Sequence, residues 1–133
     1  MRRIEDIFKK FSFSDTRCYV IRLTVMAQGY MKIEHKLPSY IQQIKHLLVI
    51  GAASSDKHTI GLVSLNFNGH AYKTLHRAIP RIKPGMDCPA PYPFDEDIQA
   101  NSFLQGYYYD ISKAKSFPYS LTIYIHYTPV PKD

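Results

Sequence analysis

The chain has 133 residues, a net charge of +6, and a composition that is 45% hydrophobic, 14% aromatic and 21% charged. This length fits one domain whose core needs no disulfide or metal for support. The longest apolar run, Leu47–Ala53, is too short to cross a membrane, and the N-terminus lacks the apolar core of a signal peptide. We therefore expect a protein that is neither secreted nor membrane-spanning. The two cysteines, Cys18 and Cys88, favour a reduced, cytosolic origin, with a single disulfide as the alternative.

The charges are unevenly distributed along the chain. Residues 1–83 hold 14 Lys and Arg against 5 Asp and Glu, whereas residues 84–133 hold 3 against 6. This asymmetry predicts head-to-tail electrostatic contacts between copies, or a basic face turned toward a polyanion. A solvated basic surface is the simpler alternative.

The first fifteen residues are expected to form a short amphipathic helix. Their apolar side chains follow the spacing i, i+3, i+4 and i+7 that lines one helix face: Ile4, Ile7, Phe8 and Phe11. A helix of about two turns is marginal alone, so it must dock on its own domain, on a neighbouring subunit or on a lipid surface. We therefore divide the chain into an N-terminal arm, residues 1–15, and one β domain, residues 16–133.

From Thr16 onward the hydrophobic period changes to two, which is the period of a β-strand. Seven alternating or apolar runs are expected to form strands: Thr16–Met26, Tyr30–Leu37, His46–Ala53, Thr59–Phe67, His70–Ile79, Tyr107–Ile111 and Tyr119–Thr128. In the last run, every second residue from Leu121 to Tyr127 is expected to face the core. The stretch between Pro80 and Gly106 leaves room for an eighth strand.

Two of these runs are joined by Asn68-Gly69, the strongest short hairpin signal in the chain. Asn followed by Gly tolerates the positive φ angles of a type I′ turn. A two-residue turn at this point pairs Val63 with Thr74. The sequence therefore predicts that the strands before and after this turn are antiparallel neighbours.

The following segment, Pro80–Pro93, is rich in proline and has no period, so we expect a long extended loop that binds something. Three acidic residues come next: Asp95, Glu96 and Asp97. We expect them to cap a short helix that runs to about Leu104, or to contact another subunit. A Ca²⁺ site or an acid–base pair is the weaker alternative, because the EF-hand loop pattern is missing and adjacent carboxylates rarely converge.

No motif for catalysis, cofactor binding or metal binding occurs. The six histidines never show ligand spacing such as HxH or HExxH, and GxSxG, P-loop and GxGxxG motifs are missing. Cys88 has no sequence context that would activate its thiol. The Lys and Arg residues are spread evenly, and at most two residues of Tyr107-Tyr108-Tyr109 can share one strand face as a stacking surface. We expect a non-enzymatic protein with no cofactor, metal ion, small-molecule substrate or specific nucleic-acid recognition.

Seven or eight short strands within this length predict an all-β, antiparallel sandwich, with a jelly roll as the leading candidate. The order of features resembles the single jelly-roll capsid proteins of tailless icosahedral viruses and phages in the double jelly-roll lineage. Three segments carry this resemblance: Lys36–Lys45 with its Leu-Pro corner, Gly61–Gly69, and the closing run Tyr119–Tyr127. The resemblance implies a virion structural protein, assembled in the host cytoplasm, that serves as a capsid vertex (penton) or minor capsid subunit.

The resemblance also implies a pentamer or another cyclic oligomer in contact with neighbouring capsid subunits. The residues expected to make such contacts are Ile4, Ile7, Phe8, Phe11, Asp95, Glu96 and Asp97. The N-terminal helix is expected to contact neighbours, or the membrane or genome on the inner side. Around a ring, a basic flank of one copy meets an acidic flank of the next. Unlike that family, the chain shows no long flexible arm at either end.

A jelly-roll module that binds carbohydrate or another ligand is the main alternative. Its aromatic platform would use Tyr107 and Tyr109, or Tyr92 in the proline-rich segment. The absence of Trp and of a secretion signal counts against it. A third interpretation, an enzyme on a small β-barrel, needs a convergent polar pocket that a sequence does not reveal.

Overall fold

The structure, a computed structural model, describes residues 17–55, 57–67, 74–82, 90–114 and 117–129. The helix predicted at Ile4–Phe11 lies outside these ranges, within which no helix is long and apolar enough to cross a membrane. Eight strands make up the described fold: β1 (Arg17–Val25), β2 (Gly29–Lys36), β3 (Ile41–Gly51), β4 (Thr59–Phe67), β5 (Leu75–Pro80), β6 (Tyr92–Asp97), β7 (Phe103–Asp110) and β8 (Tyr119–Pro129). The predicted all-β fold is confirmed.

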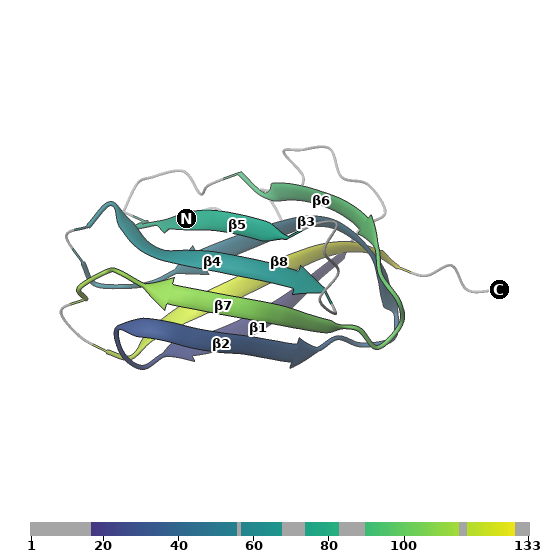
Figure 1. Ribbon diagram of the computed structural model, residues 1–133. Coiled ribbons are helices and arrows are strands. Elements are labelled where there is room, and N and C mark those ends of the chain that lie inside the picture. The colour runs from purple at the N-terminus through teal and green to yellow at the C-terminus, as the bar shows by residue number, and fades with distance from the viewer. Residues whose placement is uncertain (1–16, 56, 68–73, 83–89, 115–116, 130–133) are drawn as a thin grey trace.

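The eight strands form two four-stranded antiparallel sheets that face each other as a β-sandwich (Figure 1). One sheet has the order β1-β8-β3-β6 and the other has the order β2-β7-β4-β5. The first strand therefore pairs with the last, the second with the seventh, the third with the sixth and the fourth with the fifth. This nesting brings the two ends of the described chain together in one sheet.

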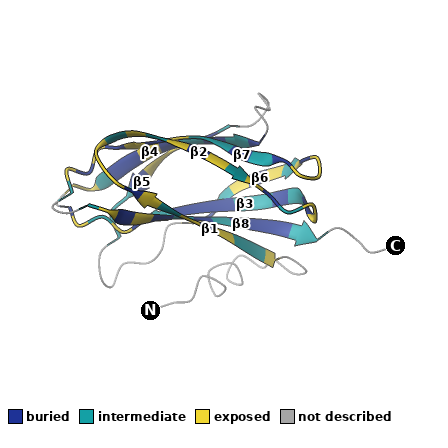
Figure 2. Cartoon of the chain, turned by 90° about the horizontal axis from the view of Figure 1, so that it is seen from below, coloured by how far each residue is buried: buried dark blue, intermediate teal, exposed yellow. Residues whose placement is uncertain are grey.

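The core lies between the two sheets, where the apolar face of each strand is buried (Figure 2). On β8 the inward residues Leu121, Ile123 and Ile125 are fully buried, as the alternating pattern predicts. The two sheets also meet through Phe67 on β4 and Phe94 on β6, whose rings pack edge to face with centroids 5.1 Å apart. Burial of these apolar surfaces is the main force that holds the layers together.

Two glycines let the sheet β2-β7-β4-β5 close tightly. Gly61 on β4 faces the ring of Tyr108, and any Cβ at position 61 would overlap that ring. Gly106 on β7 has a φ of +152° and lies so close to the backbone carbonyl of Ser64 that a Cβ would collide with it. Both positions therefore require the absence of a side chain.

The acidic segment forms a strand, so the predicted helix from Asp95 to about Leu104 is wrong. Residues up to Asp97 belong to β6, and the next strand, β7, begins at Phe103. The physical reason is burial: Phe94 and Ile98 point into the core, and the backbone N–H of Ile98 donates to the carbonyl of Gln42. Pairing with the open edge of β3 outweighs the local preference of carboxylates for a helix N-terminus.

The hairpin prediction is half right. Strands β4 and β5 are antiparallel neighbours, but Val63 lies opposite Arg77 and not opposite Thr74. Because the register differs from the predicted one by three positions, an odd number, each side chain of β5 lies on the opposite face of the sheet from the predicted one. The observed register places Leu75 opposite Leu65, so that both leucines are buried, and this gain in the core outweighs the two-residue turn. Asn68-Gly69 lies outside the described residues.

Replacement of Gly106 by alanine tests the close approach of β7 to β4. We expect Gly106→Ala to lower the free energy of unfolding by about 1–3 kcal/mol, because the strands must separate to admit the methyl group. Denaturant unfolding measures the change as a lower midpoint. Gln105→Ala, at the adjacent position on the other face of β7, is the matched control. An unchanged midpoint for Gly106→Ala would contradict the tight pairing.

Candidate functional site

The outer face of the sheet β2-β7-β4-β5 carries large aromatic side chains that are exposed to solvent. The strand registers place Tyr30 of β2, Tyr109 of β7 and Leu62 of β4 side by side across three strands. Tyr30 is 78% exposed, Tyr107 is 54% exposed and Tyr109 is 37% exposed. Exposed tyrosines gathered on one face are unusual on a surface without a partner, so this face is the first candidate site.

The rings of Tyr30, Tyr107 and Tyr109 form what we call the aromatic corner. The rings of Tyr30 and Tyr109 stack with centroids 4.5 Å apart and an interplanar angle of 27°. Tyr107 stands edge-on to Tyr30, with centroids 6.4 Å apart and an angle of 87°. The strand period explains the selection, because Tyr107 and Tyr109 point outward while Tyr108 between them is fully buried. The prediction that at most two of these three tyrosines share a face is confirmed.

Polar side chains lie directly beside the aromatic corner. The next row across the sheet aligns Lys32 of β2, Tyr107 of β7 and Ser64 of β4, with His76 of β5 opposite Ser64. The Nζ of Lys32 forms an ion pair with the carboxylate of Glu34 at 3.4 Å. Together the two rows border a shallow groove of about 410 Å³, lined by Tyr30, Leu62, Val63, Ser64, His76, Arg77, Ala78, Tyr107 and Tyr109.

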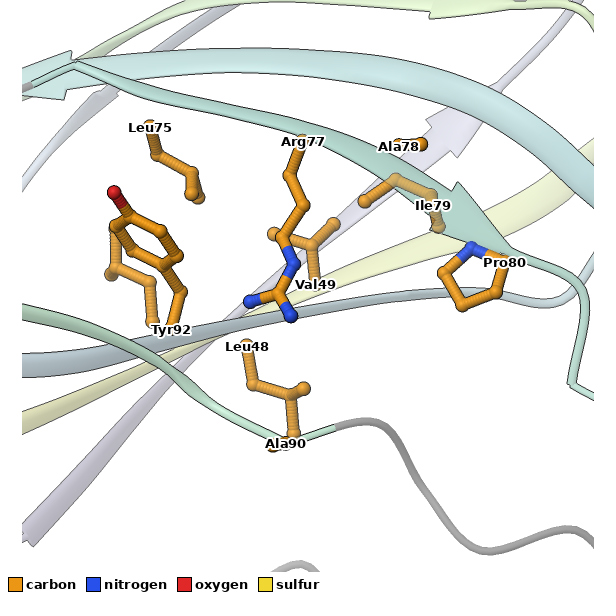
Figure 3. Close-up of a pocket in the computed structure, with 10 residues that line it drawn as sticks. Leu48, Val49, Leu75, Arg77, Ala78, Ile79, Pro80, Ala90 and Tyr92 are labelled. Carbon is orange, nitrogen blue, oxygen red and sulfur yellow. The ribbon is translucent and has the colours of Figure 1, made fainter.

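Tyr92, the other tyrosine proposed for an aromatic platform, lies elsewhere. It belongs to β6 and is half-buried at the opening between the two sheets. Figure 3 shows Arg77 reaching from β5 into this opening toward Tyr92 and Leu48. The guanidinium carbon of Arg77 lies 5.6 Å from the centre of the Tyr92 ring, which is the geometry of a cation–π contact. The face of this ring that Arg77 covers is not open to a ligand.

The candidate contact residues of the acidic segment all lie on an edge strand. β6 forms one edge of the sheet β1-β8-β3-β6 and carries the three carboxylates of Asp95, Glu96 and Asp97. The Nζ of Lys45 pairs with Asp95 at 3.3 Å, which leaves the edge acidic. The other candidates, Ile4, Ile7, Phe8 and Phe11, lie outside the described residues.

The opposite edge of the same sheet is basic. β1 forms this edge, and both of its arginines, Arg17 and Arg22, are exposed. Edge strands offer unpaired backbone groups to a further strand, so their charges govern what can approach. β1 and β6 are therefore oppositely charged edges of one sheet.

A polar cluster that sequence reasoning missed lies inside the sandwich, near the end of β7. The hydroxyl groups of Tyr119 and Ser112 donate to Oδ1 of Asp110 at 2.5 Å and 2.6 Å. Because the only proton of the Tyr119 hydroxyl is used in this way, the Tyr108 hydroxyl donates to Tyr119 at 2.7 Å. Burial raises the pKa of Tyr108 to about 12, and burial with the hydrogen bond to Asp110 raises the pKa of Tyr119. The cluster ties β7 to the start of β8.

Two histidines lie side by side on the sheet β1-β8-β3-β6, although they are 80 positions apart in the sequence. His46 of β3 lies directly opposite His126 of β8, with ring centroids 5.7 Å apart. Burial lowers the pKa of His46, and burial with the charge of His46 lowers the pKa of His126 to about 4. Both rings are therefore neutral at pH 7. Among the described residues, no three His, Cys, Asp or Glu side chains gather into a possible metal site.

The chain matches no protein-family model, no curated protein and no solved structure. Its function is therefore argued from its own surfaces. The structure provides two of them: the oppositely charged edges of the sheet β1-β8-β3-β6, and the aromatic groove on the sheet β2-β7-β4-β5.

The buried cluster predicts a loss of stability in alkali. An unfolded chain releases the Tyr108 proton near the ordinary pKa of 10. In the folded chain the pKa of Tyr108 is about 12, so the proton stays bound up to a higher pH. Stability therefore falls as the pH rises from 10 to 12, by up to about 1.4 kcal/mol per pH unit for one proton. Denaturant unfolding at several pH values should show a shallower fall for Tyr108→Phe. The exposed neighbour control, Tyr107→Phe, should keep the slope of the wild type, and equal slopes in all three proteins would contradict the prediction.

Proposed function

We propose that this chain is a non-enzymatic virion protein, a jelly-roll subunit that assembles into a cyclic oligomer at a capsid vertex (penton) or as a minor capsid protein. The strand order is the observation that carries the proposal. Eight strands nested first with last, second with seventh, third with sixth and fourth with fifth are what two interlocked Greek keys produce. Viral capsid subunits are prominent among proteins that use this arrangement.

The segments that resemble capsid subunits fall on corresponding parts of this fold. Residues 36–45 run from the end of β2 through a corner into β3, which crosses to the other sheet. Residues 61–69 include most of β4, and residues 119–127 make up most of β8, beside the first strand. This agreement between sequence order and strand order supports the jelly-roll assignment.

The charged edges support assembly. In a ring, each copy uses two different surfaces, one toward each neighbour, so the two surfaces must complement each other. The acidic edge at β6, with Asp95, Glu96 and Asp97, and the basic edge at β1, with Arg17 and Arg22, lie on opposite sides of one sheet. We propose that β6 of one copy faces β1 of the next, and that opposite charge selects this approach over β1 facing β1.

The N-terminal arm, residues 1–15, is assigned a contact role in the same proposal. The apolar stripe Ile4, Ile7, Phe8 and Phe11 lies a few residues before β1 in the sequence, and β1 is the edge that we assign to the contact between copies. We propose that it contacts the neighbouring subunit, or the membrane or genome on the inner side of a capsid.

The oligomeric state tests this proposal. We expect size-exclusion chromatography with light scattering to give one closed oligomer, a pentamer in the vertex assignment, whose stability falls as salt rises. Charge reversal at one edge, Arg22→Glu, should weaken the oligomer, and the second reversal Glu96→Lys in the same chain should restore it in part. Lys36→Glu on β2, the edge of the other sheet, is the matched control. A monomer at high protein concentration and low salt would overturn the proposal.

A further inference from the structure

We propose that the groove on the outer face of the sheet β2-β7-β4-β5 binds a neutral saccharide. The inference goes beyond assembly and does not depend on it, because the groove lies on a different sheet from the charged edges. The volume of the groove, about 410 Å³, falls within the range of small-ligand sites.

The aromatic corner supplies the stacking surface. The flat face of a pyranose ring carries C–H groups, which are apolar and slightly positive, and these groups fit the negative face of an aromatic ring. Tyr30 offers such a face because 78% of its surface is exposed while its ring is supported by Tyr109. Tyr107 stands at nearly a right angle to Tyr30 and can flank a sugar ring placed against it. Stacked neighbours hold these rings in place, so little side-chain freedom is lost on binding.

The row beside the corner supplies hydrogen bonds. Ser64 and His76 line the groove next to Tyr107, and each can both donate and accept. Sugar hydroxyl groups also both donate and accept, so they suit a site in which such groups stand next to an apolar surface. Tyrosine hydroxyl groups at the rim add further partners of the same kind.

The charges on this face favour a neutral ligand over a polyanion. A groove for single-stranded nucleic acid combines aromatic rings with a run of unpaired basic residues. Here Lys32, opposite Tyr107, is paired with Glu34 at 3.4 Å. Arg77 also lines the groove, but its guanidinium group is turned toward the ring of Tyr92 on β6. A second copy of the chain is also a poor fit, because a stable dimer buries roughly 800 Å² on each partner. The large exposed apolar side chains of this groove are few: Tyr30, Leu62, Tyr107 and Tyr109.

Titration of the full chain with neutral oligosaccharides tests the proposal. The probes are cellotetraose, triacetylchitotriose and an array of uncharged glycans, followed by NMR shifts and by calorimetry. We expect at least one probe to bind, and Tyr30→Ala or Tyr109→Ala to weaken it by about tenfold or more. Tyr30→Phe should keep the stacking surface and most of the affinity. Tyr40→Ala, at a tyrosine that is 48% exposed outside the groove, is the matched control and should change nothing.

Thermal melting of each variant separates lost binding from lost folding, and we expect the melting temperature of Tyr30→Ala to stay close to that of the wild type.

Four results would overturn the proposal. They are no binding of any neutral glycan up to about 10 mM, equal weakening by Tyr40→Ala, tighter binding of oligo(dT) than of any glycan, and dimerisation that Tyr30→Ala abolishes. The first three results say nothing about the oligomeric state that tests the capsid proposal, so the saccharide site and the capsid assignment can fail separately.

Discussion

The pairing of β1 with β8 is the constraint on which the rest of the structure depends. Among the described strands, β1 is an edge strand that pairs with β8 alone, from Arg17 opposite Tyr127 to Val25 opposite Tyr119. The same β8 also pairs with β3, so the last strand of the described chain joins the first strand to the middle of its sheet. Because these strands are far apart in the sequence, the sheet depends on long-range pairing between the two ends of the described chain.

This nesting also decides which residues are left for function. It makes β1 and β6 the two edges of one sheet, and so separates Arg17 and Arg22 from the carboxylates of Asp95–Asp97 in space. On the other sheet, β7 contributes side chains both to the core and to the outer surface. Tyr108 is held inside by hydrogen bonding to Tyr119, while Tyr107 and Tyr109 are turned toward solvent beside Tyr30. The rigid inner side of the strand therefore fixes the position of the outer rings.

The failed predictions share one cause, which is that a distant contact outweighed a local signal. The acids at Asp95–Asp97 favour a helix start, yet the segment is a strand because Phe94 is buried against Phe67 across the sandwich. A two-residue turn favours one register for β4 and β5, yet Leu75 pairs with Leu65. Local preferences are worth about 1 kcal/mol or less per residue, whereas burial of a large apolar side chain is worth about 1.5–3 kcal/mol.

The sequence by itself determined the strands and their faces, because side-chain alternation is a local property of an extended backbone. It identified most strands, the inward residues of β8 and the outward direction of Tyr107 and Tyr109. Only the tertiary structure decided which strands are neighbours, because partner choice depends on burying all the apolar faces together. That choice brought Tyr30 onto Tyr109 and His46 onto His126, and it placed opposite charges on opposite edges. Both candidate surfaces are products of strand order, which no local pattern contains.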